Sequence, residues 1–156
     1  MMTKQSVAGR ESSEPIVVGI DGSGPARTAL FWAAAEARRW GRSLLVVHSY
    51  QYPTVAAGFG VAPDLADPGI IHEAAVELAR QEIDRVLGPH TGLRVDLEVV
   101  CGSPAAVLVE LSKEAEVLVV GSRGRGGFTG LLLGSVSQQV AQHSRCPVVI
   151  IREPEA

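Results

Sequence analysis

The chain has 156 residues, 46% of them hydrophobic, with a formal net charge of −3. The length suits one domain that buries its own core without disulfides. The slightly acidic balance excludes a general attraction to nucleic acid or to an anionic membrane. No segment approaches the roughly 20 consecutive apolar residues of a membrane span. We therefore expect neither nucleic acid nor a membrane as a partner.

Cysteine and histidine usage is sparse. Cys101 and Cys146 lie far apart and outside any CxxC motif, and the four histidines lack metal-ligand spacing. This pattern predicts two buried or half-buried thiols in a reducing cytoplasm. Residues 1–14 are polar and lack the apolar stretch of a signal peptide. We expect a disordered lead-in over 1–14, one domain over 15–153 and a cytoplasmic location.

The first predicted elements are a strand over 16–20 and a helix over about 25–40. The strand is a continuous β-branched run, typical of a strand buried on both faces. Asp21-Gly22-Ser23-Gly24-Pro25 then forms a turn, with Ser23 as the expected N-cap of the helix. Apolar residues recur at helical spacing up to Trp40, and Gly41 is the expected stop. A second apolar strand follows over 44–48.

The middle of the chain begins with a stretch that fits no period, residues 50–69. It carries three prolines and several glycines, and we interpret it as a long loop, either a lid or partner surface or a passive insertion. A helix over about 70–87 follows. Residues 94–100 alternate between apolar and charged, which is expected of an edge strand with one wet face. A helix over 104–114 and a short apolar strand over 117–120 come next.

The chain ends with a glycine-rich stretch over 121–134, a helix over 135–143 and a strand over 148–151. Strands and helices thus alternate throughout, which indicates parallel strands joined by right-handed crossovers. The predicted fold is α/β, a Rossmann-like open sheet of five parallel strands in the order 3-2-1-4-5, with helices on both faces. Ligands of such sheets bind beyond the carboxyl ends of the strands where the order reverses, here between the first and fourth strands.

The glycine-rich stretch is the most informative feature for function. It opens a helix directly after a buried strand, and bare glycines let the backbone approach a ligand and form an anion-binding nest. The helix beginning near Ser135 adds free N–H groups. Ser135 and Ser137 are expected to donate hydroxyl hydrogen bonds to phosphate, and Arg123 and Arg125 to add positive charge. The absence of GKS or GKT excludes a Walker A loop.

Asp21 ends the first strand, opposite this stretch. One interpretation makes it a turn and capping residue. The other makes it an acceptor for a ribose or base, or a ligand of Mg²⁺ held against phosphates. The sequence leaves both open.

Gly121-x2-Gly124-x9-Gly134-Ser135 resembles the G-2x-G-9x-G-(S/T) signature of the ATP-binding class of universal stress proteins. The opening Val18-Gly19-Ile20-Asp21-Gly22-Ser23 and the closing Cys146-Pro147-Val148-Val149-Ile150 are also similar to that family, over Pro15 to Arg152.

The resemblance implies a role for each matching residue. Gly121 would lie near the ribose, and Gly124, Gly134 and Ser135 would cradle the phosphates. Asp21 would lie near the adenosine and the metal, the Ser49 backbone would face the adenine, and Val120 would floor the pocket. Gly19 stands where some members carry a proline. The predicted nucleotide-binding residues are Gly19, Asp21, Ser49, Val120, Gly121, Arg123, Gly124, Gly134, Ser135, Val136 and Ser137.

The function expected from this resemblance is an ATP-binding, nucleotide-dependent regulatory or stress-response module, with Mg²⁺ as the ATP counter-ion and an unidentified regulatory partner. The family implies a homodimer through the last strand. That strand, Val148-Val149-Ile150-Ile151, would leave an apolar edge unpaired in a monomer. The alternatives are a slow ATPase or phosphotransferase, and AMP or cyclic AMP as the ligand. No Walker lysine or obvious base supports efficient turnover, and the complete signature disfavours a scaffold without a ligand.

Overall fold

The structure is a computed structural model that describes residues 13–52, 67–89, 92–125, 130 and 132–154. Most of the predicted lead-in and the centre of the loop over 50–69 lie outside the described residues. The same holds for positions 126–129 and 131 of the glycine-rich stretch.

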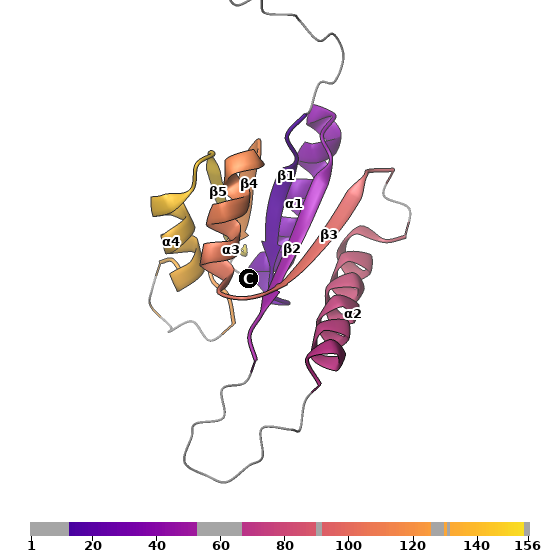
Figure 1. Cartoon of the computed structure of the whole chain (residues 1–156). Coiled ribbons are helices and arrows are strands. Elements are labelled where there is room, and N and C mark those ends of the chain that lie inside the picture. Colours follow the sequence, from indigo (N-terminus) through magenta and orange to yellow (C-terminus); the bar gives the residue numbers. More distant parts are fainter. Residues whose placement is uncertain (1–12, 53–66, 90–91, 126–129, 131, 155–156) are drawn as a thin grey trace, which may run out of the picture.

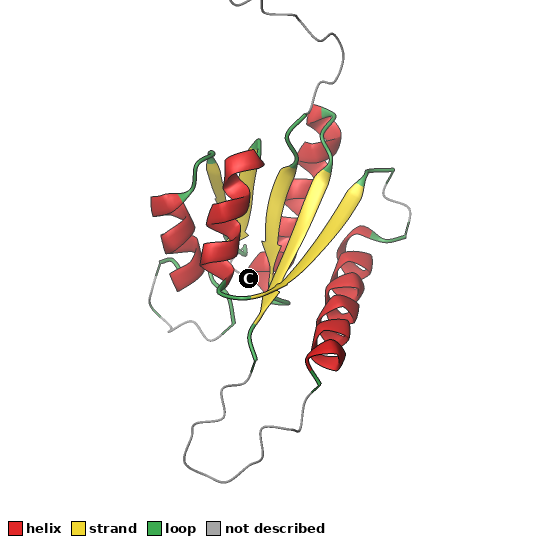
Figure 2. Cartoon of the chain, viewed as in Figure 1, coloured by secondary structure: helices red, strands yellow, loops and turns green. Residues whose placement is uncertain are grey.

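Strands and helices alternate along the described chain, as predicted (Figures 1 and 2). The order is β1 (Ile16–Ile20), α1 (Gly24–Trp40), β2 (Leu44–Tyr50), α2 (Pro68–Leu87), β3 (Val95–Cys101), α3 (Pro104–Leu111), β4 (Val117–Gly121), α4 (Ser135–His143) and β5 (Val148–Ile151). None of the helices in these ranges is both long enough and apolar enough to cross a membrane.

The five strands form one sheet in the order β3-β2-β1-β4-β5, and every neighbouring pair is parallel. This confirms the predicted fold class, including the edge position of β3. The continuous apolar strands β1 and β4 occupy the middle, where both faces are covered, and their residues are almost all buried.

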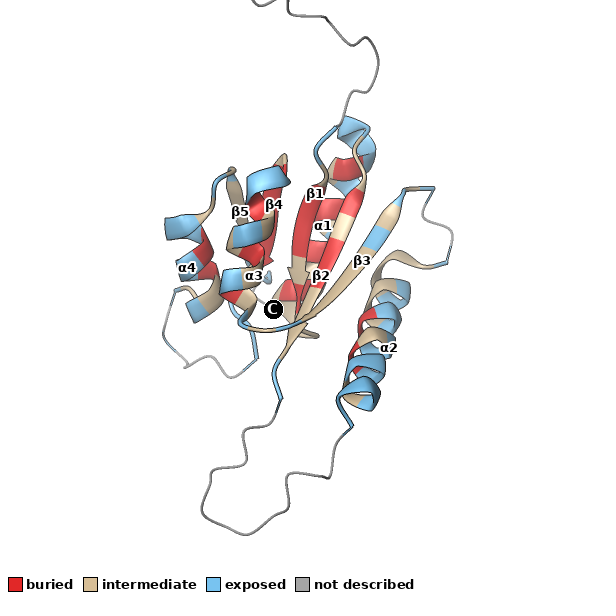
Figure 3. Ribbon diagram, viewed as in Figure 1, coloured by how far each residue is buried: buried red, intermediate tan, exposed pale blue. Residues whose placement is uncertain are grey.

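Helices cover both faces of the sheet (Figure 1). The faces divide by alternation along each strand: Ile16 and Val18 pack with α1 and α2, whereas Val17 packs with α3 and α4. Figure 3 shows the buried residues concentrated on the central strands and on the inner face of α1. The α3–α4 face is the one that carries the site.

Local signals account for most helix ends. Ser23 accepts a hydrogen bond from the Ala26 N–H at 3.3 Å, and Gly41 ends α1 at φ 65°. The helix predicted over 104–114 ends earlier, at Leu111. It continues as a 3-10 turn over Ser112–Glu114. At this junction the buried Ser112 hydroxyl donates to the Val109 carbonyl at 2.6 Å.

Candidate functional site

A pocket of about 540 Å³ lies beyond the carboxyl ends of β1, β2 and β4, on the α3–α4 face. This volume suits a small organic ligand. It is lined by Gly19, Ile20, Asp21, Ala26, Val47, Ser49, Pro104, Leu108, Val120, Gly121, Arg123, Gly124, Arg125, Leu133, Gly134, Ser135, Val136, Ser137 and Gln138. All eleven residues predicted to bind a nucleotide are among them, so the structure brings the whole predicted set together.

One half of the pocket is apolar. Val47 and Val120 project from β2 and β4, and Leu108 of α3 faces them from the opposite side. Pro104 and Leu108 of α3 also line the pocket and were not among the residues predicted from the sequence. The element order could have indicated this contribution, because α3 begins directly after β3, at the same edge of the sheet as the glycine-rich stretch.

Gly121 ends β4 where it passes the first turn of α1. A Cβ atom at this position would lie 2.8 Å from the Pro25 carbonyl carbon and 2.9 Å from the Ala26 nitrogen. Both are backbone atoms, which cannot yield as a flexible side chain can. Only glycine therefore lets β4 and α1 meet here, beside the pocket.

Gly124 has a similar constraint from another partner. A Cβ atom there would lie 2.5 Å from Oδ2 of Asp21. The same Oδ2 accepts a hydrogen bond from the Arg125 backbone N–H at 3.0 Å. The glycine therefore leaves room for the Asp21 carboxylate to reach the stretch after β4.

The other oxygen of Asp21 acts within its own turn. Oδ1 accepts hydrogen bonds from the Ser23 N–H at 2.9 Å and from the Ser23 hydroxyl at 2.5 Å. The predicted turn role of Asp21 is therefore confirmed. A role toward a ligand or metal is untested by this geometry and stays a prediction.

The N-terminus of α4 opens into the polar half of the pocket. The first N–H groups of α4, like those of any helix, lack an intrahelical acceptor. Gly134 is the N-cap and supplies no side-chain acceptor for them. They coincide with the positive end of the helix dipole. The Ser135 side chain is exposed at this end. This arrangement is suited to an anion.

The structure corrects the expected role of Ser137. Its side chain is 2% exposed, and its hydroxyl donates to the carbonyls of Ser122 and Gly134, both at 3.0 Å. The Ser122 carbonyl also accepts from the Gly134 N–H at 2.7 Å. The third residue of α4 points inward and closes the base of the glycine-rich stretch, so its hydroxyl is not available to a phosphate.

Charge in the lining comes from three side chains. Arg123 and Arg125 are exposed cations on the stretch after β4, and Asp21 is the single carboxylate among the residues that line the pocket. The two arginines and the α4 N-terminus make the polar half electropositive. The pocket thus combines an apolar half with an anion-binding half.

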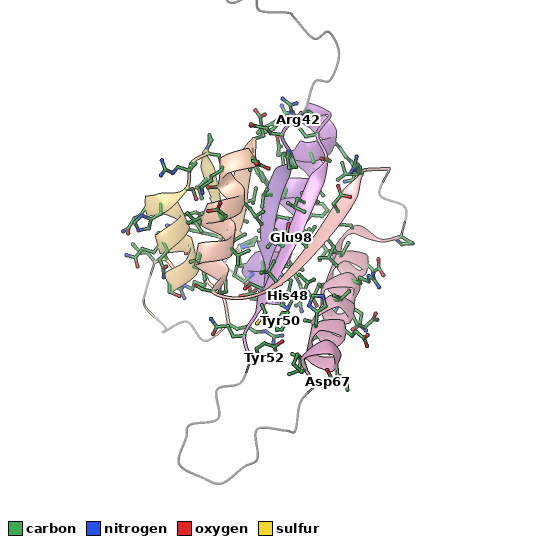
Figure 4. All side chains as sticks on the ribbon, in the orientation of Figure 1. Arg42, His48, Tyr50, Tyr52, Asp67 and Glu98 are labelled. Atoms are coloured by element: carbon green, nitrogen blue, oxygen red, sulfur yellow. The ribbon has the colours of Figure 1, made fainter. Side chains whose placement is uncertain are left out.

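The opposite face of the sheet carries other polar groups. Figure 4 shows His48, Tyr50 and Tyr52 at the end of the sheet away from Arg42, near the beginning of α2. The Tyr50 hydroxyl lies 3.0 Å from Nδ1 of His72, and His48 Nδ1 lies 3.1 Å from the Ile20 carbonyl oxygen. None of these side chains lines the pocket. The described part of the chain holds no group of three or more His, Cys, Asp or Glu placed to bind a metal.

The two thiols differ in exposure. Cys146 is half-buried, as predicted, but Cys101 is exposed. The prediction for Cys101 is wrong because this residue ends the edge strand β3 and has a neighbouring strand on one side only.

Comparison with known proteins places this geometry in a family. The model of the universal stress protein family matches residues 13–152. This chain belongs to the universal stress protein family. Universal stress protein Rv2623 of Mycobacterium tuberculosis is 36% identical over 154 residues, which are 96% of this chain and 49% of the relative. The chain spans about half the length of the curated relatives it matches.

Solved structures of the same family share the fold. A universal stress protein in complex with cAMP is 27% identical, with a TM-score of 0.62, and the match covers 90% of this chain and 98% of that one. A universal stress protein from Archaeoglobus fulgidus in complex with dAMP is 26% identical, with a TM-score of 0.54 and coverage of 88% and 96%. Relatives of this domain thus include adenine nucleotide complexes.

Proposed function

We propose that this universal stress protein domain binds an adenine nucleotide, with ATP as the principal ligand. The observation that carries the proposal is one pocket in which an apolar half meets the uncapped N-terminus of α4. A nucleotide has the same two-part character, an apolar base and an anionic phosphate chain. The cAMP and dAMP complexes of relatives support the class of ligand.

The residues present suit such a ligand. The base would lie between Val47, Val120 and Leu108, near the backbone of Ser49, whose hydroxyl already donates to the Gly102 carbonyl at 2.6 Å. The phosphates would lie at the α4 N-terminus, on the N–H groups that follow Gly134.

ATP is favoured over AMP or cyclic AMP by the number of positive groups in the polar half. Arg123 and Arg125 line the pocket in addition to the α4 N-terminus, which suits a ligand with several phosphate charges. Mg²⁺ would enter with ATP as the counter-ion of the phosphates. The complexes with cAMP and dAMP keep monophosphates as the alternative ligands.

We also propose that the chain is a binder more than an efficient ATPase or phosphotransferase. Phosphoryl transfer needs a group that orients the nucleophile. Asp21, the single lining carboxylate, has both oxygens engaged in hydrogen bonds. A nucleotide-dependent regulatory role in a stress response follows, with a protein partner still to be identified. The cytoplasmic location stays a prediction.

The homodimer is part of the same proposal. Within the described ranges β5 pairs with β4 alone, and the carbonyls of Pro147 and Ile151 accept hydrogen bonds from the β4 side. Because backbone groups alternate along a strand, those of Val148 and Ile150 face the free edge. A second β5 would satisfy them.

Calorimetric titration with ATP, ADP, AMP and cyclic AMP in the presence of Mg²⁺ tests the ligand. Ser135→Glu places a carboxylate at the first residue of α4, where acidic side chains favour the helix but repel phosphate. Ser135→Gln is the uncharged control of the same size. We expect ATP to bind most tightly and Ser135→Glu to weaken it far more than Ser135→Gln does. Equal ATP affinity in the two variants would place the phosphates elsewhere, and no binding by the unmodified chain would refute the function.

A further inference from the structure

The Asp21 carboxylate links two segments that are 104 positions apart in the chain. Oδ1 is held by Ser23 in the turn after β1, and Oδ2 accepts from the Arg125 N–H in the segment after β4. β1 and β4 are neighbours in the sheet, so this link spans the crevice where the strand order reverses. We call residues Gly121–Arg125 the first arm of the glycine-rich stretch.

Among the described residues, the far end of the first arm makes one backbone hydrogen bond, from the Arg125 N–H to Asp21. Its near end is fixed, because the Ser122 N–H donates to the Ile151 carbonyl at 2.7 Å and the Ser122 carbonyl accepts from Gly134. Beyond Ser122, Arg123 and Gly124 are exposed and line the pocket. The hydrogen bond from Arg125 to Asp21 therefore restrains the far end of this exposed pair, which also lies beside the backbone of Gly134.

Two further observations show that the link has been accommodated by its surroundings. Gly124 leaves the space that the carboxylate occupies, since a Cβ there would lie 2.5 Å from Oδ2. The Arg125 side chain crosses back over the turn, with Nη2 3.0 Å from where a Cβ of Gly22 would be. The carboxylate thus accepts three hydrogen bonds out of the roughly four that such a group can take.

We propose that Asp21 is a positioning residue, which holds the first arm in place for the phosphates through the Arg125 N–H and does not ligate Mg²⁺. This inference rests on the proposed nucleotide site. It separates Asp21 from a metal-ligand role, because protein donors already occupy three of the roughly four acceptor sites of this carboxylate. It also explains why position 124 is a glycine, because a Cβ atom there would clash with the Asp21 carboxylate.

The first test compares ATP affinity with Mg²⁺ and with EDTA. Asp21→Ala is expected to weaken ATP binding by about tenfold or more, the effect of losing one hydrogen bond to a charged acceptor. The factor should be the same in both buffers. Asp21→Asn should retain most of the affinity, since its amide oxygen can still accept from the Arg125 N–H. A loss confined to the Mg²⁺ buffer, or an equal loss in Asp21→Asn, would overturn the proposal in favour of a metal ligand.

A double-mutant cycle separates positioning from direct contact with the nucleotide. Arg125→Pro removes the N–H, and Arg125→Ala is the matched control that removes only the guanidinium. Arg125→Pro should bind ATP more weakly than Arg125→Ala by the factor that Asp21→Ala causes. In the Asp21→Ala background the choice between proline and alanine at 125 should no longer matter. The two double variants should therefore bind ATP with the same affinity. If the fold-losses in ATP affinity from Asp21→Ala and Arg125→Pro instead multiplied in the double variant, Asp21 would contact the ligand itself.

A third readout needs no nucleotide. Amide hydrogen exchange at Arg125, followed by NMR on the ligand-free chain, should be slowed in the unmodified protein and at least fivefold faster in Asp21→Ala. Unchanged exchange would refute the link even in a chain that binds no ATP. Failure of the unmodified chain to bind ATP, with the exchange effect present, would refute the proposed function and leave the link intact.

Discussion

Gly121→Ala tests the packing that places β4 and α1 beside the pocket. The new Cβ would lie 2.8 Å from the Pro25 carbonyl carbon, where ordinary contact begins at 3.4 Å. It would also lie 2.9 Å from the Ala26 nitrogen and from the Pro25 Cβ. Three atoms of the first turn of α1 are therefore about half an ångström too close, and the turn or the end of β4 has to move.

Overpacking of this kind costs about 1–3 kcal/mol. The neighbours here are backbone atoms, so we expect a cost toward the upper end of this range. Alanine also lowers the conformational entropy of the unfolded chain, which stabilises the fold by about 0.4–1 kcal/mol. We expect a net loss of about 2 kcal/mol, which lowers the Tm of a chain of this size by roughly 4–8 °C. ATP affinity should fall as well, because Gly121 and Ala26 both line the pocket.

Gly134→Ala is the matched control. A Cβ at 134 would have its nearest neighbours at 3.4–3.6 Å, close to ordinary contact, and φ there is −75°. Thermal melts should place Gly134→Ala within about 1 kcal/mol of the unmodified chain, a loss that reflects the poorer N-cap that alanine makes. Equal melting temperatures for the two variants would refute the packing argument at Gly121.

Three further predictions concern the rest of the fold. Glu82 accepts from Arg27 through both oxygens, at 2.7 and 3.2 Å, and this hydrogen bonding lowers the pKa of Glu82. A lowered pKa means stability that is present above the pKa of an unfolded Glu, about 4.3, and lost as pH falls through the folded value. In Glu82→Gln the Tm should thus decrease less as the pH is lowered than it does in the unmodified chain. An unchanged dependence of Tm on acidic pH would contradict this. Ser137→Ala removes a buried hydroxyl and should cost about 1 kcal/mol in urea unfolding, and no change would show that this hydroxyl adds nothing to stability. Cys101 is exposed whereas burial raises the pKa of Cys146. A thiol reagent should therefore give a fast phase that Cys101→Ser abolishes, and loss of the slow phase instead would reverse the assignment.

The fold could be predicted from the sequence because its signals are local. The continuous apolar runs of β1 and β4 indicate central strands, and the alternation over 94–100 indicates an edge. The glycine-rich stretch and Asp21 follow β4 and β1 directly. The strand order alone is therefore enough to bring them to one crevice.

The details of the site depend on contacts between distant segments, which no local pattern encodes. The bond from Arg125 to Asp21 spans 104 positions. The inward turn of Ser137 depends on the Ser122 carbonyl, which is presented by the end of β4. The apolar wall of Leu108 depends on how α3 lies over the sheet. Each of these three contacts could be identified only after the fold had placed the two segments side by side.

A crystal structure of the chain with ATP and Mg²⁺ is the decisive test of the proposed site. We expect the base against Val120 and Leu108, and the phosphates on the N–H groups that begin α4 at Ser135. A nucleotide bound outside this pocket, or one inside it with the phosphates turned away from α4, would refute the proposed binding mode.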